Sequence, residues 1–73
     1  MREKTTITHE DFLELSSDIA EAIVVNRIGN LDLVWVMDEN KTYHFTEEAQ
    51  ELFNENLDII QQCFRNQFTI INQ

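Results

Sequence analysis

The hydrophobic positions of the chain follow a helical period in two long segments. In the later segment they recur at steps of three and four residues, which is one edge of an α-helix. The positions on this edge are Ala49, Phe53, Leu57, Ile60 and Phe64. Thr46 is a favoured N-cap residue, Glu47 and Glu48 suit the positive end of a helix, and Arg65 suits its last turn. We therefore predict a helix over residues 46–65.

The earlier segment has the same character. Its apolar stripe consists of Phe12, Leu15, Ile19, Ala22 and Ile23, widened by Leu13, Ala20 and Val24. Thr8 precedes it as an N-cap, and Gly29, the only glycine of the chain, stands where a helix C′ residue is expected. These features predict a helix over residues 9–27 whose apolar stripe faces the core.

Between the two helices the pattern changes to alternation, which is typical of strands. Residues 31–45 hold two such stretches on either side of the polar turn 38–41, and this arrangement predicts a β-hairpin. One face is expected to pack on the helices: Leu31, Leu33, Trp35, Met37, Tyr43 and Phe45. The opposite face is expected to point away from the helices: Val34, Val36, Thr42 and His44.

The flanking segments are short. Residues 1–7 read as an extended arm that is compatible with a strand over Lys4–Ile7. In the tail 66–73 the β-branched residues favour a strand, although the apolar spacing also fits a continued helix. The expected fold is α+β, a single domain in the order α-β-β-α with helices packed on the hairpin. If both flanks pair as edge strands, the order becomes βαββαβ, which is compatible with a split βαβ sheet.

Length and cysteine content limit how this fold is held together. The chain has 73 residues, so it buries a modest core, and its one cysteine, Cys63, cannot form an internal disulfide. Self-association or good packing is the expected reinforcement, with Cys63 a small core or interface residue. The N-terminus lacks a secretory signal and the longest apolar run, residues 33–37, is too short to span a bilayer, so we expect a cytoplasmic protein.

Charge narrows the class of partner. Fourteen acidic against five basic residues give a formal charge of −9, which argues against direct binding to nucleic acid or to anionic membranes. Nine acidic residues recur at helical spacing: Glu10, Glu14, Asp18 and Glu21 in the first helix, and Glu47, Glu48, Glu51, Glu55 and Asp58 in the second. No Lys or Arg lies between residues 5 and 26 or between residues 42 and 64, so these stripes lack the usual i,i+4 partners.

Unpaired stripes of one sign suggest that a partner supplies the positive charge. Each four-residue step rises about 6 Å along a helix, close to the spacing of roughly 6–7 Å between phosphates on a DNA strand. We therefore expect a module that binds a basic, nucleic-acid-binding protein surface, in its extreme form a DNA mimic of the kind phages and mobile elements use as inhibitors. The alternative is a homo-oligomeric structural or regulatory module, such as a homodimer, that associates through the outer face of the hairpin while its acidity serves only solubility. The residues expected at that contact are Val34, Val36, Thr42, His44, Ile70 and Ile71.

The residues that usually carry catalysis or metal binding do not form a recognisable set. Segment 38–42 resembles the start of a calcium loop, but Tyr43 stands at the sixth position, where glycine is required, and Ala49 at the twelfth, where glutamate is required. His9 and His44 are isolated in the sequence, and a single glycine provides no phosphate-binding loop. We expect no catalytic, cofactor or metal site.

Overall fold

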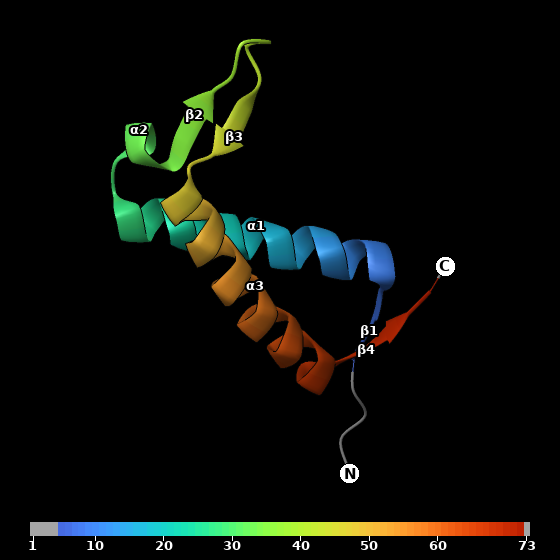
Figure 1. The fold of residues 1–73 in the computed structure, drawn as a ribbon. Coiled ribbons are helices and arrows are strands. Elements are labelled where there is room, and N and C mark those ends of the chain that lie inside the picture. Colours follow the sequence, from blue (N-terminus) through green and yellow to red (C-terminus); the bar gives the residue numbers. More distant parts are fainter. Residues whose placement is uncertain (1–4, 73) are drawn as a thin grey trace.

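The computed structural model describes residues 5–72, and its elements belong to the α+β class (Figure 1). In chain order these are β1 (Thr5–Thr8), α1 (His9–Ile28), α2 (Leu31–Val34), β2 (Trp35–Met37), β3 (Tyr43–Phe45), α3 (Glu47–Gln67) and β4 (Phe68–Ile71). The two long helices run in roughly opposite directions, with the hairpin β2–β3 at one end of the pair and β1–β4 at the other.

Both ends of α1 form as the sequence predicts. The Thr8 hydroxyl accepts a 3.1 Å hydrogen bond from the amide of Asp11, which satisfies one of the free N–H groups of the first turn. Gly29 has φ of 76°, and its amide donates to the carbonyl oxygen of Val25 at 2.9 Å. Only a residue without a Cβ adopts this left-handed conformation at little cost, so the single glycine ends the helix.

Helix α3 starts after Thr46 as predicted and continues two residues beyond Arg65, to Gln67. The tail then becomes β4, and the alternative of a continued helix is wrong from Phe68 onward. Strand β4 pairs in parallel with β1, placing Ile70 opposite Ile7. The strand expected in the arm is therefore present as Thr5–Thr8, while Lys4 lies outside the described residues.

The four strands form two separate two-stranded sheets, so the split βαβ arrangement is wrong. Strand β1 leads directly into α1, whereas the hairpin follows its far end, and a helix of 20 residues lies between them. Such a helix is about 30 Å long. Strands of three or four residues are too short to bridge that distance beneath the helices.

The first half of the predicted hairpin is also different, because Leu31–Val34 forms the helical turn α2. The Asn30 side chain caps this turn by accepting a 3.0 Å hydrogen bond from the amide of Asp32. Helical geometry rotates Val34 into the core, where it is completely buried. The predicted outward position of Val34 is therefore wrong, and Leu31 is 61% exposed instead of packed.

The main core lies where the hairpin meets the two long helices. Val24, Val34 and Ala49 are completely buried there, each contributed by a different helix. The aromatic rings of Trp35 and Phe45 stack at 4.5 Å across the hairpin and cover this cluster, as the alternation predicts for these two residues. Their common face continues outward to Met37 and Tyr43, which stay exposed because the hairpin projects beyond the helices (Figure 1).

A second cluster joins the opposite ends of the long helices. The ring of Phe12, near the start of α1, lies 6.1 Å from that of Phe64, which in turn meets Phe68 edge-on at 5.5 Å. The guanidinium group of Arg65 lies 5.3 Å from the centre of the Phe12 ring, a cation–π geometry. This cluster holds the start of α1 against the end of α3 and fixes where β1 and β4 meet.

The buried edge of α1 differs from the predicted stripe. The buried positions are Phe12, Ser16, Ala20 and Val24, at strict four-residue steps. The small side chains of Ser16 and Ala20 let α3 approach closely along this ridge, as in helix packing along i±4 rows. Leu15 and Ile19, predicted to be core, are 48% and 40% exposed. The residues predicted on the apolar edge of α3 are all at least half-buried, and Ala49 alone among them is fully buried.

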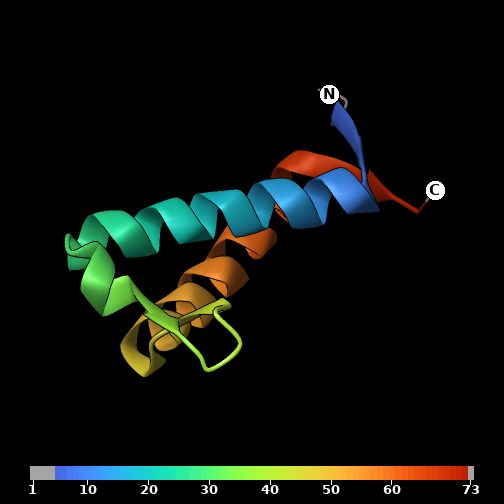
Figure 2. The same cartoon turned by 90° about the horizontal axis from the view of Figure 1, so that it is seen from above.

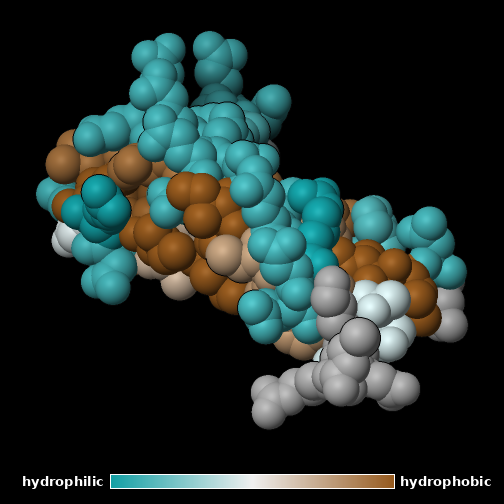
Figure 3. Space-filling model, turned by 90° about the horizontal axis from the view of Figure 1, so that it is seen from below, coloured by the Kyte–Doolittle hydropathy of each residue, from teal (hydrophilic) through white to brown (hydrophobic). Residues whose placement is uncertain are grey.

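The molecule is long and thin. Its extents are 50 × 25 × 14 Å. Seen from above, α1 lies across α3, and the hairpin β2–β3 lies over the start of α3 (Figure 2). From below, hydrophobic side chains gather in a broad band on the surface (Figure 3). Much apolar surface therefore remains uncovered within one chain.

Candidate functional site

The first candidate surface is the α3 acidic row, defined as Glu47, Glu48, Glu51, Glu55 and Asp58. Every member is exposed. Helical geometry places these carboxylates on the side of α3 opposite the edge that Ala49, Phe53 and Phe64 turn toward α1. The helix therefore presents one purely anionic face to solvent, on a rigid element that is anchored at both ends.

Within residues 5–72 almost nothing neutralises this row. Among residues 5–72 the ion pair that the structure shows joins His44 to Asp38, and neither residue belongs to α3. The one local partner of the row is Gln62, whose amide donates a 3.2 Å hydrogen bond to Asp58. This bond leaves the negative charge of Asp58 in place.

The members of the row are not equivalent. Glu47 and Glu48 lie in the first turn of α3, where the positive end of the helix dipole stabilises carboxylates. Glu51, Glu55 and Asp58 lie further along, where that effect has faded and like charges at i,i+4 repel by a few tenths of a kcal/mol per pair. These three residues are therefore the part of the row without a structural reason to be acidic.

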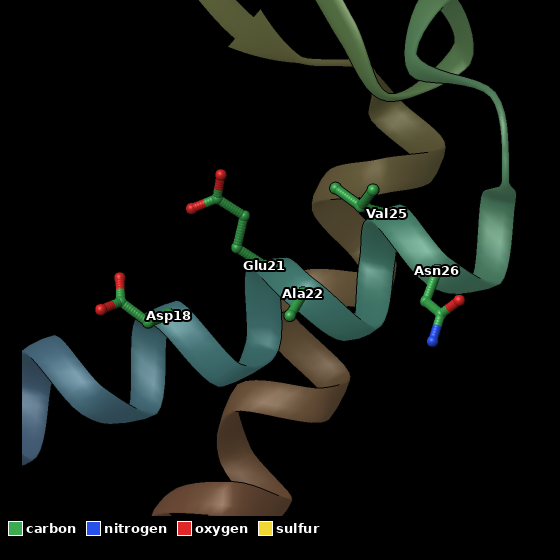
Figure 4. A pocket seen from close by; sticks show the side chains of 5 residues that line it. All are labelled: Asp18, Glu21, Ala22, Val25 and Asn26. Carbon is green, nitrogen blue, oxygen red and sulfur yellow. The ribbon is translucent and has the colours of Figure 1, made fainter.

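The α1 acidic row consists of Glu10, Glu14, Asp18 and Glu21, and all four are exposed. Asp18 and Glu21 project from the same side of α1 (Figure 4). No hydrogen bond within the described part of the chain joins this row to the α3 row, and each follows its own helix. The structure thus keeps the predicted acidic residues on the surface without gathering them into one cluster.

The hairpin turn holds a charged site that sequence reasoning missed. One carboxylate oxygen of Asp38 accepts hydrogen bonds from the amides of Asn40 and Thr42 at 2.8 and 3.0 Å, and the other lies 2.6 Å from Nε2 of His44. The Thr42 amide, then His44, holds the pKa of Asp38 below its ordinary value. An Asp opening a turn is the signal for such a side-chain-to-backbone bond. Here the bond supports Lys41, whose φ is 63°.

The residues predicted for self-association do not form one surface. Val34 is buried, so it cannot contact another molecule. Val36, Thr42 and His44 are exposed on the hairpin, whereas Ile70 and Ile71 are half-buried in β4 at the other end of the molecule (Figure 1). The separation follows from the two distinct sheets. Val34 is therefore not available as a contact residue, and the other five residues lie on two separate parts of the chain.

Three apolar side chains of α2 and β3 are exposed, although the alternation pattern predicts them in the core. Leu31, Leu33 and Tyr43 are 61%, 53% and 61% exposed. Leu31 and Tyr43, with Asp32 and Trp35, line an open hollow of ≈ 480 Å³. This patch was missed because the alternation pattern did not reveal the helical turn α2.

The remaining candidates carry little chemistry. Cys63 is exposed, which corrects its expected place in the core, and His9 is exposed beside the Phe12 ring. Within residues 5–72 no three His, Cys, Asp or Glu side chains are grouped so as to hold a metal ion. Over the same residues, no helix has the combination of length and apolar character that crossing a bilayer requires.

Comparison of this chain with protein-family models, with curated proteins and with solved structures gives no match.

Proposed function

We propose that this protein is a small acidic interaction module that binds a basic protein surface through the α3 acidic row. The observation that supports this most directly is the face formed by Glu51, Glu55 and Asp58, which is exposed, anionic and without a basic partner among the described residues. The carboxylates of this surface repel one another, so positive charge from a partner that faces them lowers the free energy of the complex.

The geometry of the row favours a partner with regularly spaced positive groups. The steps from Glu51 to Glu55 and from Glu55 to Asp58 rise about 6 and 4.5 Å along the helix. The longer step is close to the spacing of roughly 6–7 Å between phosphates on a DNA strand, to which basic proteins bind through Lys and Arg. The proposed partner is therefore a nucleic-acid-binding protein, and the proposed role is to occupy its basic surface as a DNA mimic would, in the manner of a phage or mobile-element inhibitor.

The proposed activity is binding and not catalysis. It places the protein in the cytoplasm, where nucleic-acid-binding partners are present and where the exposed thiol of Cys63 stays reduced. Steering by the −9 net charge should speed association with a basic partner and should weaken as salt screens it. Salt dependence is therefore the property that an experiment should measure.

The test is capture of partners from the native cell with the tagged full chain, at low and at high salt. Two triple variants with equal net charge are compared: Glu51→Gln with Glu55→Gln and Asp58→Asn on α3, and Glu14→Gln with Asp18→Asn and Glu21→Gln on α1. We expect the wild type and the α1 variant to capture a basic nucleic-acid-binding protein at low salt. The α3 variant should not capture it. Equal retention by both variants, or equal loss, would show that this face does not select the partner.

A further inference from the structure

Helix α1 has an apolar side that no other part of residues 5–72 covers. We define the α1 seam as Leu15, Ile19, Ala22 and Asn26. Leu15 and Ile19 are 48% and 40% exposed, and Ala22 and Asn26 are also exposed. The adjacent edge, on which Ser16 and Ala20 are buried, is already used for packing on α3. The seam is therefore a second helix edge without a partner.

The spacing of the seam is that of a two-stranded coiled coil. Its residues follow at steps of four, three and four, which places Ile19 and Asn26 at a positions and Leu15 and Ala22 at d positions of a heptad. A β-branched residue at a with leucine at d favours parallel pairs of helices, and a single asparagine at a fixes register and oligomeric state. The pattern thus has three separate features of a parallel dimer.

The heptad assignment places no pair of acidic residues opposite each other across the seam, although two copies that each carry −9 repel each other at long range. In a parallel pair each g position faces an e position of the partner helix. Asp18 at g would face Ile23 at e, so no acidic residue meets another acidic residue across the seam. The α3 acidic row lies on the other long helix and stays exposed in such a pair.

The surface around the seam is hollowed. An open depression of ≈ 470 Å³ is lined by Asp18, Glu21, Ala22, Val25 and Asn26, on the side of α1 away from α3, which passes behind α1 in Figure 4. A second depression, of ≈ 330 Å³, lies beside Ile23, Asn26 and Arg27. The short side chain of Ala22 leaves room between larger neighbours, which is what a knob from a second helix requires.

The exposed area matches what a dimer would bury. A compact monomer of 8.7 kDa exposes about 4,700 Å², whereas this chain exposes 5854 Å². The excess of about 1,100 Å² is comparable to the roughly 800 Å² that each partner buries in a standard interface.

We propose that two copies of this chain pair in parallel along the α1 seam, with the side-chain amides of Asn26 and its copy hydrogen-bonded to each other. An amide both donates and accepts, so it is complementary to its own copy. The seam has no charged residue that would select a different partner. This interface is separate from the proposed function, and it presents the α3 acidic row twice in each dimer.

Sedimentation equilibrium of the full chain, from low micromolar to several hundred micromolar, tests the proposal. The wild type is expected to dimerise. Ala22→Glu, which keeps high helix propensity and places two like charges at one d layer, is expected to raise the dimer dissociation constant at least about 100-fold. Ile19→Asp should act in the same way. Circular dichroism of each variant shows whether the monomer stays folded.

Ile59→Asp is the matched control, because Ile59 is 60% exposed on α3 and outside the seam. It should leave the dissociation constant within a few-fold of the wild type. A wild type that stays monomeric at several hundred micromolar would overturn the proposal. So would a dimer that persists in Ala22→Glu but dissociates in Val36→Asp, since that result would place the contact on the hairpin. Neither result bears on partner capture by the α3 acidic row.

Discussion

The side-chain amide of Gln61 on α3 donates a 3.3 Å hydrogen bond to the hydroxyl oxygen of Ser16 on α1. The same hydroxyl donates to the carbonyl oxygen of Phe12 at 2.7 Å, so a completely buried serine has its hydrogen bonds satisfied. This link lies within the contact between the two long helices. The buried edge of α1 therefore includes a small polar residue. The larger side chains of the α1 seam lie outside the contact with α3.

Substitution of Ser16 tests this arrangement. Ser16→Ala should change the free energy of unfolding by no more than about 1 kcal/mol, because the half-buried Gln61 amide regains a water partner. Ser16→Leu should destabilise by about 1–3 kcal/mol, because the added methylenes do not fit between the helices. Denaturant midpoints at constant m-value measure both effects. A stabilised Ser16→Leu variant would mean that Ser16 does not lie in the contact.

Two neighbouring valines, Val34 in α2 and Val36 in β2, offer a matched comparison. Val34 is completely buried, whereas Val36 is 50% exposed. Val34→Ala should cost about 1.5–3 kcal/mol, the value of burying a valine side chain plus a small cavity. Val36→Ala should stay within about 0.5 kcal/mol of the wild type. Urea unfolding compares the two variants, and the reverse order would restore the outward placement of Val34 that the alternation pattern predicts.

The hydroxyl of Thr46 joins α3 to α2. It donates to the carbonyl oxygen of Leu33 at 2.7 Å and accepts from the amide of Ala49 at 3.3 Å. Thr46→Ala loses both bonds and should destabilise by about 1–2 kcal/mol, whereas Thr46→Ser keeps the hydroxyl and most of the stability. Thermal unfolding with far-ultraviolet circular dichroism measures the difference. Equal melting temperatures for the two variants would show that the hydroxyl does not act as a cap.

The carboxyl group of Asp38 should titrate below its ordinary pKa of 3.8, because the Thr42 and Asn40 amides and His44 favour its charged form. A lowered folded-state pKa means that the stabilisation is present above the unfolded-state pKa and is lost as pH falls through the folded-state pKa. Carbon-detected NMR titration of the wild type measures this value. A midpoint at or above 3.8 would contradict the contacts in the turn.

The variant Asp38→Asn separates charge from hydrogen bonding at this turn. Its side-chain oxygen can still accept from the amides of Asn40 and Thr42, but it no longer titrates. Below about pH 4 the free energy of unfolding should therefore fall less steeply with decreasing pH in the variant. The reason is that the variant lacks a carboxyl group whose unfolded-state pKa is about 3.9. An unchanged pH dependence would place the titrating group elsewhere.

Much of the fold is predictable from local signals in the sequence. The caps at Thr8 and Thr46 and the C′ glycine at Gly29 fix the helix ends, because each satisfies backbone groups that have no other partner. The apolar edge of α3 is also correct, since its positions follow one period without competition. These features depend on residues close in sequence, which is why they can be inferred from the sequence alone.

The sequence was ambiguous where a helix carries more apolar residues than one contact can cover. Helix α1 has an edge at Phe12, Ser16 and Ala20 and another at Leu15 and Ile19, and hydrophobicity alone favours the second. Close approach of α3 selects the first, because small residues allow tight packing. Which edge of α1 is buried depends on both helices, so the apolar pattern of α1 alone does not reveal it.

The candidate surface was predicted in part. All nine acidic residues are exposed as expected, because charged side chains are rarely buried without partners. The residues expected at a self-association contact do not share one surface, since Val34 is buried and strand pairing between distant segments places Ile70 at the opposite end of the molecule from the hairpin. The Asp38 turn was recognisable only as a failed calcium loop, and its pairing with His44 depends on the hairpin register.

The most direct measurement for the account is the salt dependence of binding between this protein and the basic partner recovered by capture. Titration calorimetry at several salt concentrations compares the wild type with the Glu51→Gln, Glu55→Gln, Asp58→Asn variant and with the α1 variant of equal charge. We predict weaker binding and a shallower dependence on salt for the α3 variant alone, because this variant removes the contacts that salt screens. Identical affinities and salt slopes for the wild type and the α3 variant would contradict the claim that this face of α3 is the binding surface.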